Sequence, residues 1–248
     1  MTKLGSWAGV LGVAILMISG GLIGYWLAPG ESDGSAIDPY FQVSTYERLN
    51  DGHYEGIMTL GRLLENGDFG IGTVEGIDGE MIVLNGTAYR VGTNMVPEKV
   101  GLGTMIPFAM VTRFSTGISY DLADIDDYGE LKEMYGGMTD RLAPCIALAV
   151  MIEAEFDSIT IRSVPGQQVP YPPLSDVVAN QTTMVLNGVQ GRMIGFIMAD
   201  GLGEINPAGF HMHFLSEDLT YGGHVLDVSF DEGTMHIDEM TSMTLVQL

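Results

Sequence analysis

The chain has 248 residues, of which 46% are hydrophobic, and its 32 acidic and 10 basic side chains give a formal net charge of −22. This hydrophobic content supports a sizeable core and excludes a chain that is disordered throughout. The negative charge repels phosphate backbones and therefore disfavours nucleic-acid binding. The acids are spread along the chain, which suggests the hypothesis of a protein that works in concentrated salt, where self-repulsion is screened; the alternative is simply a soluble acidic protein.

The N-terminal part is expected to be a membrane anchor. Residues 7–28 carry no charge and are rich in Leu, Ile, Val, Gly and Ala, a run that is long for the apolar part of a signal peptide. The positive charge beside it, Lys3, precedes it, so the remainder of the chain should lie outside the cytoplasm. We expect an anchor or signal segment at 1–28 and a flexible linker at 29–38, with a secreted protein as the outcome if the segment is cleaved.

The remainder, from about residue 40, reads as two β-rich layers with few helices. Short helices are predicted at 59–67 and 174–180, and residues 121–136 are acidic and helix-compatible. Residues 143–155 are mostly apolar and fit either a buried strand or a buried helix. Strands are predicted at 69–74, 80–84, 87–91, 107–114, 158–165 and 190–198, with Asn85-Gly86 as a hairpin turn.

Three of the five histidines lie close together near the C-terminus. His211 and His213 are two residues apart, so on a strand they project from the same face. A polar, glycine-containing turn separates them from His224, and a hairpin would bring all three together. Three imidazoles leave coordination positions open, which is typical of a catalytic metal site rather than a structural one. The alternative is that one or two of them are ordinary half-buried strand histidines.

Several acids close to these histidines are expected to orient the imidazole rings from outside the metal site. They are Glu217, Asp218 and Asp227.

Short motifs occur in order along the body of the chain, and two of them contain the histidines: GFHMHF at 209–214 and GGHVLD at 222–227. The other motifs lie at 41–45, 65–73, 78–81, 107–112 and 162–165, and the last is followed by Gln168, Pro170 and Tyr171. Together they resemble the α-acetolactate decarboxylase family over residues 39–248. The resemblance implies an α/β, β-rich fold of two β-sheet domains, usually a homodimer. It also implies a zinc enzyme that converts 2-acetolactate to acetoin and CO2.

The resemblance assigns roles to six residues. It implies that zinc is bound by His211, His213 and His224, that Glu80 is the acid/base carboxylate, that Arg162 contacts the substrate, and that Thr73 lines the pocket.

These residue types suit the reaction. Loss of CO2 places negative charge on the ketone oxygen, and a zinc ion chelated by the carbonyl and the hydroxyl would stabilise the enediolate. Arg162 could bind the departing carboxylate bidentately, and a partly protonated Glu80 could deliver the proton to carbon. The alternatives are that Glu80 is a solvated acid at a strand end and that Arg162 pairs with a surface acid.

One feature departs from the family pattern, which has a further carboxylate near the C-terminus. Residues 244–248 contain no matching acid, and Asp238 and Glu239 come too early. A second interpretation is therefore a membrane-tethered, non-catalytic metal- or solute-binding β domain. A third is a cupin-like non-haem iron enzyme, although His224 follows Glu217 too closely for that pattern.

Overall fold

The computed structural model describes residues 39–138, 145–199, 202–206 and 209–247. The predicted anchor at 1–28 and linker at 29–38 lie outside these ranges. Within them, no helix combines the length and apolar character needed to cross a membrane. The predicted β-rich fold with few helices and two main sheets is confirmed.

The first sheet is mixed and has the order β14-β1-β8-β3-β4-β5-β6. Its strands are β1 (Pro39–Val43), β3 (Phe69–Thr73), β4 (Glu80–Leu84), β5 (Thr87–Val91), β6 (Pro97–Lys99), β8 (Phe108–Thr112) and β14 (Ser242–Val246). Only β1 and β14 pair in parallel among them. The predicted Asn85-Gly86 hairpin joins β4 to β5, and both residues have the positive φ that a tight hairpin turn requires.

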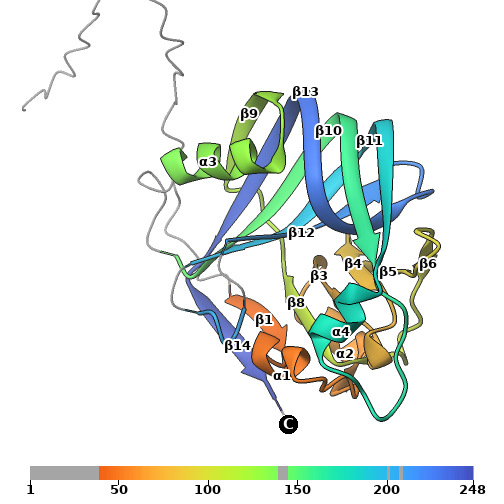
Figure 1. Cartoon of the computed structure of the whole chain (residues 1–248). Coiled ribbons are helices and arrows are strands. Elements are labelled where there is room, and N and C mark those ends of the chain that lie inside the picture. The colour runs from red at the N-terminus through yellow and green to blue at the C-terminus, as the bar shows by residue number, and fades with distance from the viewer. Residues whose placement is uncertain (1–38, 139–144, 200–201, 207–208, 248) are drawn as a thin grey trace, which may run out of the picture. The chain divides into compact units, whose positions relative to one another are not determined.

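The second sheet is antiparallel and has the order β10-β11-β12-β13-β9. Its strands are β9 (Ile118–Ile125), β10 (Ala147–Ser163), β11 (Thr182–Met198), β12 (Gly209–Ser216) and β13 (Gly222–Met240). Because β10 also pairs with β13, the strands β10, β11, β12 and β13 form a closed ring of pairings, visible in the upper half of Figure 1.

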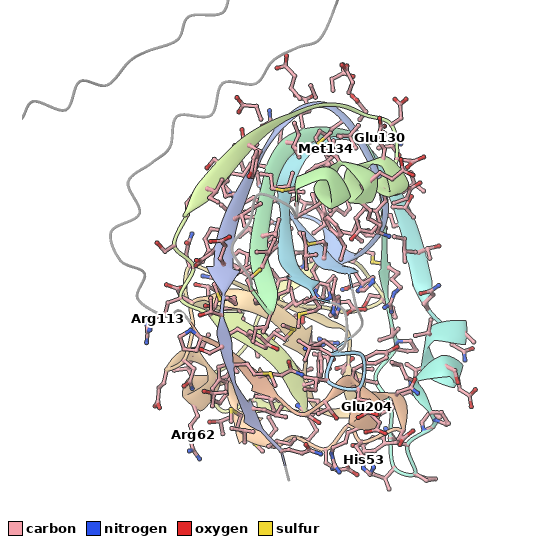
Figure 2. All side chains as sticks on the ribbon, turned by 90° about the vertical axis from the view of Figure 1, so that its left-hand side faces the viewer. His53, Arg62, Arg113, Glu130, Met134 and Glu204 are labelled. Carbon is pink, nitrogen blue, oxygen red and sulfur yellow. The ribbon has the colours of Figure 1, made fainter. Side chains whose placement is uncertain are left out.

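Short elements complete the fold. Two short strands, β2 (Met58–Thr59) and β7 (Met105–Ile106), pair with each other, and the helices are α1 (Tyr46–Asn50), α2 (Leu60–Leu64), the 3-10 turn η1 (Glu75–Ile77), α3 (Tyr128–Met138) and α4 (Leu174–Ala179). The Thr45 hydroxyl caps α1 by accepting a hydrogen bond from the backbone N–H of Arg48. The helix α3 packs beside β9 and β13, and Figure 2 shows Glu130 and Met134 on it.

The structure resolves one open prediction and corrects another. Of the predicted segment 143–155, residues 147–155 form a strand, since β10 runs from Ala147 without a break into the predicted strand at 158–165, whereas 143 and 144 lie outside the described residues. The prediction that 121–136 is helix-compatible throughout was wrong for its first part, which belongs to β9. Leu122 and Ile125 of β9 are buried and the strand pairs with β13, so a tertiary partner overrides local composition there.

The two sheets share a core. One buried cluster combines Tyr40 and Phe69 of the first sheet with Phe196 of the second. The ring centroid of Phe196 lies 6.2 Å from that of Tyr40 and 6.3 Å from that of Phe69. These contacts fix the strands of one sheet against those of the other, including β4 against β12, where the candidate site lies.

Candidate metal and catalytic site

The predicted histidine hairpin is present. His213 of β12 pairs directly with His224 of β13, and His211 lies two residues earlier on β12. The three ring centroids are separated by 5.2 to 5.4 Å. One ligand atom from each ring lies within 4.8 Å of the others. The hairpin thus brings one nitrogen atom from each of the three histidines into a single cluster.

The proton on His213 can be located from its partner. His213 Nδ1 lies 3.0 Å from the carbonyl oxygen of Met81 in β4. Because a carbonyl oxygen only accepts, Nδ1 carries the ring proton, and Nε2 keeps its lone pair for a ligand. The same contact ties the histidine hairpin to the first sheet.

All three imidazoles favour the neutral form that binds metals. Burial lowers the pKa of His211 and of His213 to about 3 in each case. Burial, reinforced by the positive charge of Arg162, holds the pKa of His224 well below its ordinary value. At neutral pH, protons therefore compete only weakly with a metal ion for the nitrogen atoms of these rings.

The cluster also contains buried nitrogen atoms that form no hydrogen bond, one of which, His213 Nε2, faces the Glu80 carboxyl group. His211 Nδ1, His213 Nε2 and His224 Nδ1 are buried and form no hydrogen bond. Leaving a buried polar atom unpaired costs about 1 to 3 kcal/mol. A metal ion bound by imidazole nitrogen would remove at least part of that penalty, and nitrogen donors of this kind suit zinc, copper, iron and nickel. The residues present therefore fit a bound metal.

The acids expected to orient these rings make other contacts. Asp218 accepts hydrogen bonds from Ser216 and Thr220, and Asp227 accepts one from the backbone N–H of Tyr128. That prediction was wrong for these two acids. The Met81 carbonyl, which no side-chain pattern reveals, orients His213 in their place.

Glu80 and Arg162 meet beside the histidines. Arg162 lies on β10 directly opposite His224 of β13, whereas Glu80 begins β4 in the other sheet. Glu80 Oε1 lies 3.2 Å from Arg162 Nη1, and Glu80 Oε2 lies 3.3 Å from His213 Nε2. Burial raises the pKa of Glu80, and the Arg162 guanidinium opposes that rise. Glu80 is thus a carboxyl group that holds its proton more readily than a solvated one.

Thr73 lies on β3 and is buried at the same site. Its hydroxyl donates a hydrogen bond of 2.6 Å to the carbonyl oxygen of Gly79, one residue before Glu80. The donated proton leaves the hydroxyl oxygen free to act as an acceptor. The bond also fixes the backbone turn that carries Glu80 into the site.

A cavity of about 360 Å³ brings the six predicted residues together. Sequence reasoning missed its other walls, which come from α1, α4, the 3-10 turn η1, and residues in or just after strands. These residues are Tyr46, Leu49, Gly72, Ile77, Phe108, Val164, Leu174, Val178 and Phe210. The signal for them was weak, because apolar side chains at helical or strand spacing most often indicate ordinary core.

Comparison with known proteins identifies relatives over most of the chain. A sequence model of the alpha-acetolactate decarboxylase family matches residues 40–247. The alpha-acetolactate decarboxylase of Methanosarcina mazei is 35% identical over 216 residues, which cover 86% of this chain and 73% of that protein. That of Methylococcus capsulatus is 36% identical over 200 residues, or 80% of this chain and 75% of that protein.

A solved structure gives the same result. The crystal structure of alpha-acetolactate decarboxylase from Bacillus subtilis strain 168 superimposes with a TM-score of 0.80 at 29% identity, covering 84% of this chain and 88% of that one. The residues that the family model matches, 40–247, include both sheets and the histidine hairpin. The chain therefore belongs to the alpha-acetolactate decarboxylase family.

Proposed function

We propose that this protein decarboxylates 2-acetolactate to acetoin and CO2 through an enediolate. Membership of the family supports the substrate and the reaction type. The observation that carries the proposal is the position of the Glu80 carboxyl group, which lies 3.2 Å from Arg162 and 3.3 Å from His213 within one cavity. In this proposal Glu80 is the acid, Arg162 is the cation that binds the substrate carboxylate, and the histidines bind the metal. All of these side chains line the same cavity.

We further propose that the metal is zinc and that His211, His213 and His224 hold it. The buried ring nitrogens that form no hydrogen bond, and the lowered pKa values of the rings, support this assignment. When bound, zinc supplies Lewis-acid stabilisation of negative charge on a substrate oxygen. Three protein ligands leave room for a substrate in the coordination sphere.

The protein residues then have separate tasks. The Arg162 guanidinium binds the substrate carboxylate and orients its bond to C2. When that bond breaks, CO2 leaves, and the electron pair passes through C2 to the ketone oxygen, forming the enediolate. Neutral Glu80 donates its proton to C2, which yields acetoin, and the Glu80 carboxylate then regains a proton from solvent. The Thr73 oxygen accepts a hydrogen bond from the substrate hydroxyl in this proposal, which is supported by the donation of its own proton to Gly79 and by its position in the cavity lining.

Acetoin and CO2 formed from racemic 2-acetolactate test the proposal. We expect turnover by the zinc-loaded full chain, and its loss on chelation and in His213→Ala. Zinc binding at one equivalent without CO2 release above that of His213→Ala would favour the non-catalytic binding domain. The matched control is His53→Ala, because His53 is exposed and projects from the surface in Figure 2.

We also propose that residues 7–28 anchor the protein with its catalytic domain outside the cytoplasm, and that two copies form a homodimer. The uncharged run and Lys3 support the anchor, and the family resemblance supports the dimer. Retention in membranes after alkaline carbonate extraction, together with cleavage of the domain by protease added to intact spheroplasts, tests the anchor. Sedimentation equilibrium of the detergent-solubilised chain tests the dimer.

A further inference from the structure

The end of β10 that enters the cavity is held against the first sheet by two successive residues. Arg162 approaches Glu80, with 3.2 Å between Nη1 and Oε1. The next residue, Ser163, donates a hydrogen bond of 2.7 Å from its hydroxyl to the backbone carbonyl oxygen of Val91. Successive residues of a strand project to opposite faces. The end of β10 is therefore held on both faces, by Glu80 on one and by Val91 on the other.

Val91 connects this hydrogen bond to the rest of the site. It ends β5 and pairs with Glu80 on β4, so the Ser163 hydroxyl is bonded to the residue directly opposite Glu80. Val91 also lies close to Gly222 at the start of β13, where an added Cβ atom would be only 2.9 Å from Val91 Cγ2. His224 follows Gly222 by two residues. One buried residue thus adjoins the strand of the acid, the strand of the arginine and the histidine hairpin.

The Ser163 hydroxyl has no alternative to this bond in solvent. Ser163 is 0% exposed, so water cannot replace the Val91 carbonyl, and a buried hydroxyl without a partner is costly. The length of 2.7 Å is typical of a well-formed bond from a hydroxyl to an oxygen. The bond joins β10 of the second sheet to β5 of the first. It is therefore a fixed link across the junction of the two sheets, one residue from Arg162.

The position of the Arg162 guanidinium depends on the backbone that carries it. Among the residues that the structure describes, the guanidinium has one ion-pair partner, Glu80. A substrate carboxylate that binds Arg162 would compete with Glu80 for it, and the strand end would then be the remaining constraint. A misplacement of about 1 Å can lower a reaction rate about 100-fold. A link that fixes the end of β10 therefore matters for the site.

We propose, resting on the function proposed above, that Ser163 is a positioning residue that holds Arg162 where its guanidinium binds the substrate carboxylate. The bond to Val91 fixes the end of β10 relative to Glu80, so the cation and the acid keep their places when the substrate enters. Ser163 itself lies outside the cavity lining, so it acts through Arg162. Loss of its hydroxyl should therefore weaken substrate binding more than the chemical step.

The test combines Ser163→Ala with Arg162→Lys in the zinc-loaded full chain. Ser163→Ala should raise KM for 2-acetolactate by about fivefold and lower kcat by less than about twofold, which corresponds to a displacement well below 1 Å. If Ser163 acts through Arg162, the KM of the double variant should be close to that of Arg162→Lys alone, whereas independent effects would multiply. An unchanged KM in Ser163→Ala, or multiplied effects in the double variant, overturns the proposal.

Two further variants separate positioning from a general loss of stability. Thr112→Val removes a hydroxyl that is also 0% exposed and also donates to a backbone carbonyl, that of Pro39, but Thr112 lies outside the cavity lining. It should lower the urea midpoint without changing KM. Ser163→Cys fills the space with a weak donor, so it should raise KM as Ser163→Ala does, and it takes the place of that variant if the alanine chain does not fold. A KM that rises equally in Thr112→Val, or stays at the wild-type value in Ser163→Cys, contradicts the role of this hydrogen bond.

A binding experiment separates this proposal from the decarboxylase proposal. The analogue 2,3-dihydroxy-2-methylbutanoate keeps the carboxylate but has no ketone to accept the electron pair, and calorimetry measures its affinity for the zinc-loaded chains. If acetolactate is not turned over, yet Ser163→Ala weakens analogue binding about fivefold and adds nothing to Arg162→Lys, the positioning role stands and the decarboxylase proposal fails. If acetolactate is turned over while Ser163→Ala changes neither KM nor analogue affinity, the positioning role fails alone. Without turnover, an analogue affinity that is absent, or equal in the wild type and Ser163→Ala, overturns both.

Discussion

Glu80 Oε1 lies 3.2 Å from Arg162 Nη1 across the junction of the two sheets, with side chains that are 10% and 16% exposed. Neither sheet could assemble this pair alone, because Glu80 begins β4 and Arg162 lies near the end of β10. Removal of one member of a buried ion pair leaves the other without compensation. The site is thus coupled to the packing of the sheets, and its residues are best tested by substitutions that preserve shape.

Glu80→Gln should lower kcat for acetolactate by about 100-fold or more, with a smaller change in KM. The amide keeps the size of the side chain but cannot donate an acidic proton, and general acid catalysis typically contributes about 10²- to 10⁴-fold. Steady-state kinetics of acetoin formation measure the effect. Glu204→Gln is the control, since Glu204 is exposed and stands on the surface in Figure 2. Retention of the wild-type kcat by Glu80→Gln would remove Glu80 from the proposed mechanism.

Arg162→Lys should raise KM by about tenfold, equivalent to about 1.4 kcal/mol of binding. Lysine keeps the charge but loses the planar fork that binds a carboxylate with two hydrogen bonds. Initial rates over a substrate series separate KM from kcat. Arg62→Lys, on the exposed side of α2 in Figure 2, should change neither. A selective fall in kcat with an unchanged KM would contradict a substrate-binding role for Arg162.

Zinc should stabilise the folded chain, because it binds a cluster that exists only when β12 and β13 pair. At free zinc 100 times its dissociation constant, the expected gain is about 2.7 kcal/mol in the free energy of unfolding. Urea titrations with zinc and with a chelator measure it. The gain should vanish in His213→Ala and persist in His53→Ala. An equal gain in both variants would place the zinc elsewhere.

The proximity of the six candidate site residues could be predicted from the sequence. The i, i+2 spacing of His211 and His213 and the turn before His224 specify one face of one hairpin, and the structure has that hairpin. Glu80, Arg162 and Thr73 were implied by the family resemblance, and the cavity brings them together with the histidines. Local pattern and motif order were sufficient because these positions are tied to recognisable turns and strands.

What could not be predicted depends on long-range packing. The β9 strand could not be predicted from its acidic local sequence, because its strand conformation depends on pairing with β13. The Met81 carbonyl that orients His213 is a backbone group, and any residue type would supply it. Likewise, Val178 and Leu49 carry no chemical signature, and they line one cavity in a fold where the segment after α1 is hydrogen-bonded to the segment before α4. Such features emerge from tertiary contacts rather than from local sequence.

The metal-free protein should lose stability as the pH falls from about 6.5 towards about 3. Over this range, His211 and His213 stay neutral in the folded state, since burial lowers the pKa of each to about 3, while the unfolded chain gains protons near the ordinary value of 6.5. Their contribution is therefore present above pH 6.5 and is lost as the pH falls. Glu80 acts in the opposite sense, because its raised pKa gives a contribution that is present below its ordinary value of 4.5 and lost at higher pH.

Urea unfolding of the metal-free chain between pH 7 and pH 4 measures the balance. We expect His213→Gln to flatten the loss of stability on acidification, and His53→Gln to leave it unchanged. Glu80→Gln should steepen the net fall, because it removes the group that opposes the histidines. A wild type that gains stability on acidification over this range would contradict the prediction.

Added salt should stabilise the protein by screening its surface acids. The net charge is −22, and within the described ranges Asp121 of β9 and Glu232 of β13 line one surface hollow without a basic residue in its lining. Repulsion between exposed charges weakens as the Debye length falls from about 10 Å at 0.1 M to about 3 Å at 1 M salt. The melting temperature should rise with KCl and rise less with sucrose of equal osmolality. Glu232→Lys should reduce the dependence of the melting temperature on KCl, and Glu232→Gln should reduce it less. If KCl raises the melting temperature equally in the wild type and in both variants, charge repulsion at this hollow is ruled out.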